Sequence, residues 1–121
     1  MDEEGVVKPA AGVERNKVAA GTATESQALI AETDGAPNFS MRRFIMGAGG
    51  GMPRHTNTVE HEQYVLRGRA RVGIGERIHE VGPDDVLYIP AGTPHYYEVV
   101  EHPFEFICVV PNGPDRIEIL D

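Results

Sequence analysis

The sequence predicts an all-β protein that folds as one β-barrel or β-sandwich domain. From Ser26 onward, short runs rich in β-branched and aromatic residues alternate with Gly, Pro, Asn and Asp. No segment of helical length shows the period of an amphipathic helix. The chain has 121 residues, which suits one domain and is too short for two. Many short strands without helices favour a sandwich or closed barrel over an α/β fold.

The strand-like runs are separated by residues that supply a positive φ or interrupt a ladder, such as Gly47–Gly51 and Gly68. Residues 1–24 have neither strand nor helix periodicity, so we predict an arm that is flexible or ordered by a partner. Residues 25–121 are predicted to form the barrel. The nine predicted strands are Ser26–Glu32, Ser40–Met46, Met52–Thr58, His61–Leu66, Arg69–Ile74, Arg77–Val81, Val86–Ile89, Pro94–Val100 and Phe104–Val110.

Charged residues predict which face of each strand points inward. Glu98 and Glu105 are expected to meet solvent or a sheet edge, so their immediate neighbours lie on the opposite face. The residues expected to point inward are His95, Tyr97, Val99, Phe104, Phe106, Cys108 and Val110, and the same alternation groups His55 with Asn57 and His61 with Gln63 and Val65. Imidazole and amide side chains therefore share the predicted interior with aromatic ones.

Composition argues against several functions. The chain has 19 acidic and 11 basic residues and a net charge of −8, which opposes nucleic-acid binding because that needs a clustered basic face. No run approaches the roughly 20 apolar residues that cross a bilayer, and the acidic start lacks the positive region of a secretory signal. The single cysteine, Cys108, cannot form an internal disulfide. We expect a cytoplasmic protein with no nucleic-acid or membrane partner.

Two segments contain the residues with the clearest chemistry. Intervals of five, one, three and six residues separate Gly49, His55, Asn57, His61 and Gly68 in turn. The second segment reads Pro90-Ala-Gly92-Thr-Pro-His95. The sequence thereby resembles the cupin family, whose motifs include G-x5-H-x-H-x3-E-x6-G and P-x-G-x2-H. Asn57 stands at the second His of that pattern and His61 at its Glu, so the ligand set differs.

The chain is also similar to a subgroup of single-domain bacterial manganese cupins with four His ligands. This resemblance implies a cupin double-stranded β-helix, or jelly-roll barrel, that holds one divalent transition metal. Manganese and iron are the expected ions, with zinc, nickel and copper as alternatives. The resemblance covers residues 34–111 and rests on Ala36–Phe39, Met41-Arg42, Glu60–Glu62, Val65–Gly68 and Phe106–Pro111.

Strand geometry brings the candidate ligands together without reference to any family. His55 and Asn57 share a face, His61 follows a short turn, and His95 comes from a strand that can pair nearby. Neutral imidazole suits several transition ions and does not choose among them. Asn57 either coordinates through its carbonyl oxygen or hydrogen-bonds a metal-bound water. The alternative is a metal-free barrel in which the histidines hydrogen-bond a ligand or one another.

The ligand set predicts an anionic guest. Three neutral imidazoles leave the full charge on a divalent ion, which favours an enolate, a 2-oxo acid or a dicarboxylate. Strand phase places four further residues at the substrate pocket: Gln63, Tyr97, Phe106 and Cys108. For Cys108, apolar packing is an equal alternative to a place near the metal.

Two functions stay open at this point. One is a metal-dependent enzyme of the dioxygenase type, and the other is a non-catalytic module that senses or stores a small anion. A metal-free isomerase of the same fold would need a basic phosphate site, for which only Arg42 and Arg43 are placed, with ambiguous facing. A homodimer is expected from the resemblance and from the open strand edge at Ser26–Glu32.

Overall fold

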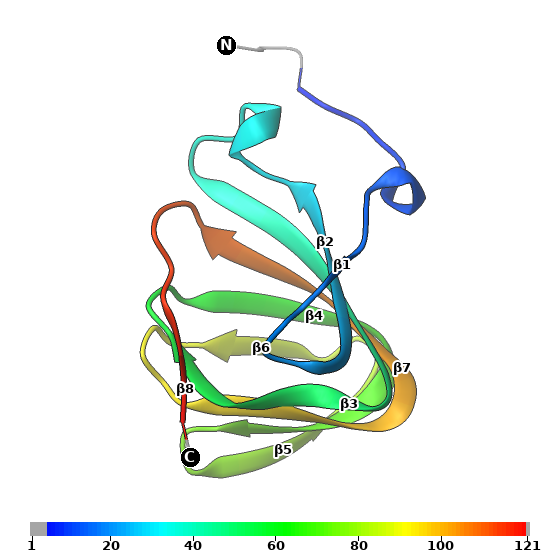
Figure 1. Ribbon diagram of the computed structural model, residues 1–121, viewed down its shortest axis with the longest axis vertical. Helices are drawn as coiled ribbons and strands as arrows, with labels where there is room; N and C mark the ends of the chain where they lie inside the picture. Colours follow the sequence, from blue (N-terminus) through cyan, green and yellow to red (C-terminus); the bar gives the residue numbers. More distant parts are fainter. Residues whose placement is uncertain (1–4, 121) are drawn as a thin grey trace.

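The structure, a computed structural model, describes residues 5–120 and is built almost entirely from β-strands (Figure 1). The predicted all-β jelly-roll barrel is confirmed, because a single antiparallel eight-stranded sheet folds over on itself. The strands are β1 (Asn16–Lys17), β2 (Thr22–Ile30), β3 (Phe39–Asn57), β4 (His61–Ile74), β5 (Arg77–Val81), β6 (Val86–Ile89), β7 (His95–Pro111) and β8 (Ile117–Ile119), with short 3-10 helices η1 (Ala10–Gly12) and η2 (Glu32–Asp34).

The three long strands each contribute to two layers. Strand β7 lies between β3 and β4, and in both pairings the first half of one strand meets the second half of the other. The ladder is irregular between Met46 and Gly51 in β3 and between Val65 and Ala70 in β4. The residues that predict turns at these places therefore form bends inside continuous strands. As a result, pairs of predicted strands are single long strands in the structure. Figure 1 shows the long strands curling at one side of the molecule.

Glycine allows neighbouring strands to approach closely at two of these bends. Gly51 has a φ of +148° and Gly68 a φ of +78°. A Cβ atom on Gly51 would lie 2.0 Å from the carbonyl oxygen of Tyr97, and one on Gly68 would lie 2.1 Å from that of Pro103. Both distances are far inside van der Waals contact. These bends of β3 and β4 therefore require residues without a side chain.

The faces predicted from alternation are largely confirmed. Phe104, Phe106 and Cys108 are almost fully buried, and His95 and Tyr97 point into the same interior. The apolar core continues across both layers and comprises Met46, Met52, Val65, Ala70, Val72, Val81, Leu87, Ile89, Tyr97, Phe104, Phe106, Cys108 and Val110. The imidazole and amide side chains named above are buried beside it.

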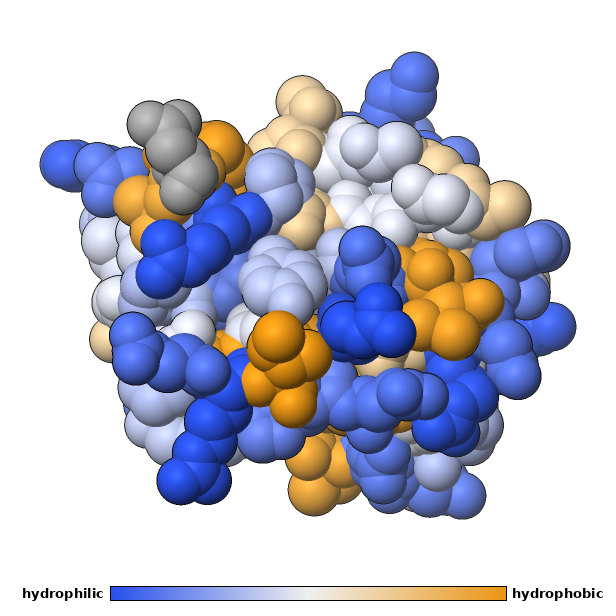
Figure 2. Space-filling view, turned by 90° about the horizontal axis from the view of Figure 1, so that it is seen from below, coloured by the Kyte–Doolittle hydropathy of each residue, from blue (hydrophilic) through white to orange (hydrophobic). Residues whose placement is uncertain are grey.

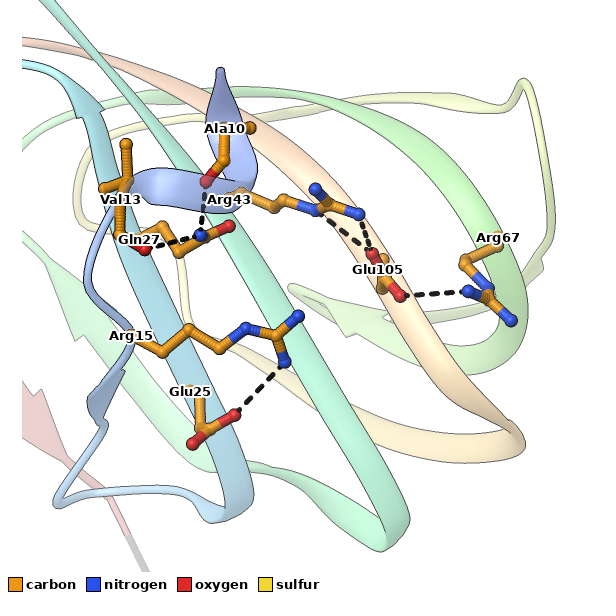
Figure 3. A network of polar contacts seen from close by, with 8 residues as sticks. All are labelled: Ala10, Val13, Arg15, Glu25, Gln27, Arg43, Arg67 and Glu105. Carbon is orange, nitrogen blue, oxygen red and sulfur yellow. Dashed lines mark hydrogen bonds and ion pairs between the residues drawn. The ribbon is translucent and has the colours of Figure 1, made fainter. Parts of the chain in front are cut away.

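The prediction that Glu105 meets solvent is wrong. Its side chain lies on the outer face of the sheet, yet the residue is only 4% exposed. Arg43 donates two hydrogen bonds to Oε1, one of them from Nε at 3.0 Å, and Arg67 Nη1 lies 3.5 Å from Oε2 (Figure 3). The two guanidinium groups cover the carboxylate, so alternation predicts its face but not its burial.

The domain boundary predicted at residue 24 falls inside β2. Strand β1 pairs with the middle of β2, and Gln27 Nε2 donates to the carbonyl oxygens of Ala10 and Val13, both at 2.9 Å (Figure 3). Much of the predicted arm therefore lies against the sheet, while residues 1–4 are outside the described part. In residues 5–120 the rest of the β2 edge has no strand partner, and homodimer pairing there stays a prediction.

The surface seen in Figure 2 is mainly hydrophilic, and its apolar residues form separate small clusters. Scattered apolar residues of this kind are ordinary on a folded domain. The described part of the chain contains no helix that is long and apolar enough to cross a membrane.

Replacing Gly51 by alanine should lower the free energy of unfolding by about 2 to 4 kcal/mol, because the new Cβ collides with a backbone carbonyl. Gly49→Ala is the matched control, since Gly49 has a φ of +69° but no atom within 4 Å of an added Cβ. Its cost should be only about 1 kcal/mol. Urea denaturation measures both variants, and equal losses would contradict this account of the bend.

Candidate metal centre

A cavity of about 200 Å³ lies between the two layers. Its imidazole and amide groups come from β3, β4 and β7, and the segment before β8 closes part of it with Asp115. Of the eight predicted site residues, Cys108 is not part of the lining. The other seven line it: His55, Asn57, His61, Gln63, His95, Tyr97 and Phe106.

His55 and His95 face each other from neighbouring strands. They are ladder partners, and their ring centroids are 4.1 Å apart. His55 Nδ1 lies 2.7 Å from the Pro53 carbonyl oxygen, and His95 Nδ1 lies 2.9 Å from that of Thr93. Because a carbonyl only accepts, each Nδ1 donates to it. Both rings are thus oriented so that Nε2 is the nitrogen available to a ligand.

His61 joins this pair from β4. Its ring centroid is 5.8 Å from that of His95. The Nε2 atoms of His61 and His95 are buried, and neither has a hydrogen-bond partner within residues 5–120. Burial, followed by the charge of Arg42, lowers the pKa of His61 to about 4, and burial likewise lowers the pKa of His95 to about 4. Both imidazoles are therefore neutral near pH 7, which is the form that binds metal ions.

Asn57 adds an oxygen atom to the same cavity. Its Nδ2 donates to Asp115 Oδ2 at 3.2 Å, while its Oδ1 is buried and has no partner in the described residues. Asp115 is itself fixed, because Oδ1 accepts the backbone N–H of Thr58 at 3.0 Å. The amide is thus held with its carbonyl oxygen unused. That oxygen suits either of the roles predicted for Asn57, ligand or hydrogen-bond acceptor.

These donor atoms fit a divalent transition metal by type. Imidazole nitrogens with a neutral oxygen are ligands that iron, manganese and zinc accept. Among residues 5–120, however, no group of three or more His, Cys, Asp or Glu side chains is close enough together to hold an ion. The ring centroids of His61 and His95 are 5.8 Å apart, whereas those of His55 and His95 are 4.1 Å apart. Metal binding by this set stays a prediction.

Gln63, Tyr97 and Phe106 form an ordered wall of the cavity. Gln63 Nε2 lies 2.7 Å from the Tyr97 hydroxyl, which is also 3.0 Å from Gln63 Oε1. Burial raises the pKa of Tyr97, so its phenol stays protonated. Phe106 stacks on Tyr97 at 5.2 Å and on Phe44 at 5.1 Å between centroids. Phe44, Phe106 and Tyr97 therefore form a column of three nearly parallel rings along this wall, and the column excludes water.

Cys108 lies behind this wall. Its thiol is fully buried, 3.5 Å from Gln63 Nε2 and 3.5 Å from Arg42 Nη2. The structure thus places Cys108 outside the cavity lining and in contact with two residues of it. Strand phase gives its inward direction, but the bulk of the neighbouring side chains covers it.

The sequence does not identify two charged residues of the cavity. Arg42 lines it, whereas Arg43 lies outside with Glu105, which settles their ambiguous facing. Asp115 follows β7 in a segment that no motif marks, 58 residues from Asn57. Its carboxylate adds a negative charge to the cavity lining besides the neutral imidazoles. Arg42 offsets that charge, so a divalent ion would still leave the cavity positive.

The chain belongs to the cupin family. Residues 42–110, more than half of the sequence, match the cupin domain. This segment contains all three cavity histidines and Asn57, so the family's domain includes the candidate site. No functionally curated protein shows significant similarity to the chain.

Solved structures agree with this assignment. The polyketide cyclase RemF from Streptomyces resistomycificus is 29% identical over 96% of this chain and 87% of that chain, with a TM-score of 0.85. A cupin-2 domain from Rhodospirillum rubrum is 21% identical over 100% of this chain and 84% of that chain, with a TM-score of 0.81. A predicted oxalate decarboxylase from Thermotoga maritima is 17% identical over 88% of this chain and 98% of that chain, with a TM-score of 0.77. The latter two likenesses concern the fold alone.

The lowered histidine pKa values predict a pH-dependent stability of the metal-free protein. Between pH 6.5 and about 4, the unfolded chain binds protons that folded His61 and His95 exclude. The free energy of unfolding should therefore fall as the pH falls through this range, with no contribution from these groups above it.

Urea denaturation from neutral pH to about pH 4 measures this dependence. His61→Asn should show a shallower fall than the original protein. His79→Asn, at an exposed position, should leave the slope unchanged. A slope unaffected by His61→Asn would contradict the assignment.

Proposed function

We propose that this protein binds one divalent transition metal, manganese or iron, and acts on a small chelating anion bound beside it. His55, His61 and His95 would hold the ion, with Asn57 at or next to it. The observation that supports this most directly is the set of buried atoms without partners, which includes Nε2 of His61, Nε2 of His95 and Oδ1 of Asn57. Leaving such atoms unpaired is costly unless a ligand completes them.

The ion would act as a Lewis acid that polarises a guest oxygen and stabilises an enolate. The chain's own residues prepare the space around that guest. The stacked rings of Phe44, Phe106 and Tyr97 exclude water, which strengthens electrostatic contacts in the cavity. The Tyr97 hydroxyl, held by Gln63, is a neutral donor for a guest oxygen.

An enolisable guest agrees with the similarity to a polyketide cyclase. Polyketide chains carry alternating carbonyl groups, and the carbon between two carbonyls loses a proton readily to give an enolate that chelates metal ions. The cavity of about 200 Å³ has room for a small guest only. We infer that the guest is a small β-dicarbonyl compound or oxo acid.

A non-catalytic binding module is the second candidate, and one observation favours it. Besides the three histidines, the ionisable side chains that line the cavity within residues 5–120 are Arg42, Tyr97 and Asp115. Asp115 already accepts hydrogen bonds from Asn57 and Thr58. No lining carboxylate is therefore free to act as a general base.

Metal content distinguishes the assigned ligands from other histidines. His95→Ala should lower metal affinity at least tenfold. Removing a group that only hydrogen-bonds a metal ligand already lowers affinity by about 10- to 100-fold, and removing the ligand itself should cost no less. His79→Ala, exposed and outside the cavity, should keep full metal content. Elemental analysis after dialysis against buffered manganese or iron gives the comparison. Equal retention by both variants would refute the ligand assignment.

Turnover distinguishes an enzyme from a binding module. We expect Mn(II)- or Fe(II)-loaded protein to consume at least one member of a panel of β-diketones, thiols and 2-oxo acids, and His95→Ala to consume none. An oxygen electrode with parallel product analysis, in air and without oxygen, separates an oxygenase from an oxygen-independent isomerase or cyclase. Tight binding without consumption of any compound would favour the binding module.

A further inference from the structure

Arg42 is the positively charged arginine among the residues that line the cavity. It lies on the inner face of β3, and its guanidinium carbon stands 5.1 Å from the centroid of the Phe44 ring. Nη2 donates to Cys108 Sγ at 3.5 Å. A thiol is a weak acceptor, so this contact does not neutralise the guanidinium.

The guanidinium has no carboxylate partner in the described chain, in contrast to several other arginines. Arg43 and Arg67 share Glu105, and Arg71 pairs with Glu98. No ion pair within residues 5–120 includes Arg42, and its Nε is buried without a hydrogen-bond partner. Of its five N–H donors, one has a protein acceptor there. The residue is half-buried, so an anion from outside that reaches the guanidinium would stabilise its charge and complete its free donors.

Sheet register fixes the relation between Arg42 and the metal donors. Arg42, Cys108 and Gln63 are ladder partners across β3, β7 and β4. Gln63 lies two residues from His61 on the same face of β4. The backbones of Arg42 and Gln63 are therefore about two strand spacings, or about 10 Å, apart, and His61 lies about 7 Å from Gln63 along β4. The side chains of Arg42 and His61 border the same cavity, so a small guest can reach both.

We propose that Arg42 binds a carboxylate of the guest, so that the substrate class is a small oxo-carboxylic acid. The carbonyl or enolate end would face the three histidines and the carboxylate would face the guanidinium. This inference rests on the proposed function, because it adds a second contact to the same guest. Guanidinium is the side chain best matched to the two oxygens of a carboxylate. Asp115 does not compete, since Asn57 and Thr58 already engage it.

The test compares two probes that share a β-diketone and differ in charge: acetylpyruvate, which has a carboxylate, and its methyl ester. Calorimetry gives the dissociation constants for the metal-loaded protein and for the metal-free protein. The acid should bind about 10- to 100-fold more tightly than the ester, because only the acid has a charged carboxylate that can pair with the guanidinium. The preference should persist without metal, since the Arg42 contact does not involve the ion.

Arg42→Met should abolish this preference, leave ester binding within about twofold and keep the metal content, whereas Arg42→Lys should restore part of it. Arg77→Met is the matched control, because it removes the same charge from an exposed position outside the cavity. It should keep the full preference.

The proposal is overturned if Arg42→Met keeps the preference for the acid, or if Arg77→Met loses it equally. A competition measurement gives a third check, in which acetate and inorganic phosphate each displace the bound acid. Equal displacement by the two anions would contradict a site for a carboxylate. Metal-loaded protein that retains its ion but binds neither probe would also overturn the proposal and leave the metal centre intact. Protein that retains no ion would refute the proposed function instead, and the metal-free measurement would still decide on Arg42.

Discussion

The whole arrangement depends on the pairing of β7 with β3 on one side and β4 on the other, in both halves of its length. One register thereby places His55 opposite His95, and the other places Arg42 beside Cys108 and Gln63. A shift of one residue would turn every one of these side chains to the outer face, because side chains alternate along a strand. The backbone hydrogen bonds of the sheet thus determine which side chains line the cavity.

The polar and charged groups of the cavity differ in whether they have hydrogen-bond partners. The carboxylate of Asp115 accepts hydrogen bonds from the neighbouring amide and backbone, whereas Nε of Arg42 and the Nε2 atoms of His61 and His95 are buried without partners in the described chain. Buried groups without partners are rare in folded proteins, and several in one small space support the proposal of a ligand site there. The aromatic column strengthens this effect by lowering the local dielectric.

Much of this site follows from short-range pattern in the sequence. The period of two on a strand is enough to group His55 with Asn57 and His61 with Gln63, and motif spacing adds His95. The same period does not reveal that arginines from two other strands cover Glu105, because that contact joins residues distant in sequence. Asp115 is unpredictable for the same reason. The glycine-rich segment at 47–51 predicts a break, but only the partner strand decides whether the chain turns or bends.

Continuity of the long strands limits how the protein can move. Because β3, β4 and β7 each pass through both layers, the layers are covalently joined and cannot open by a hinge motion. The glycine bends of β3 and β4 connect the two layers where neighbouring strands leave no room for a side chain. A substitution in the cavity lining can therefore change the chemistry of the cavity without disturbing these connections, whereas a substitution at a bend would displace the backbone itself.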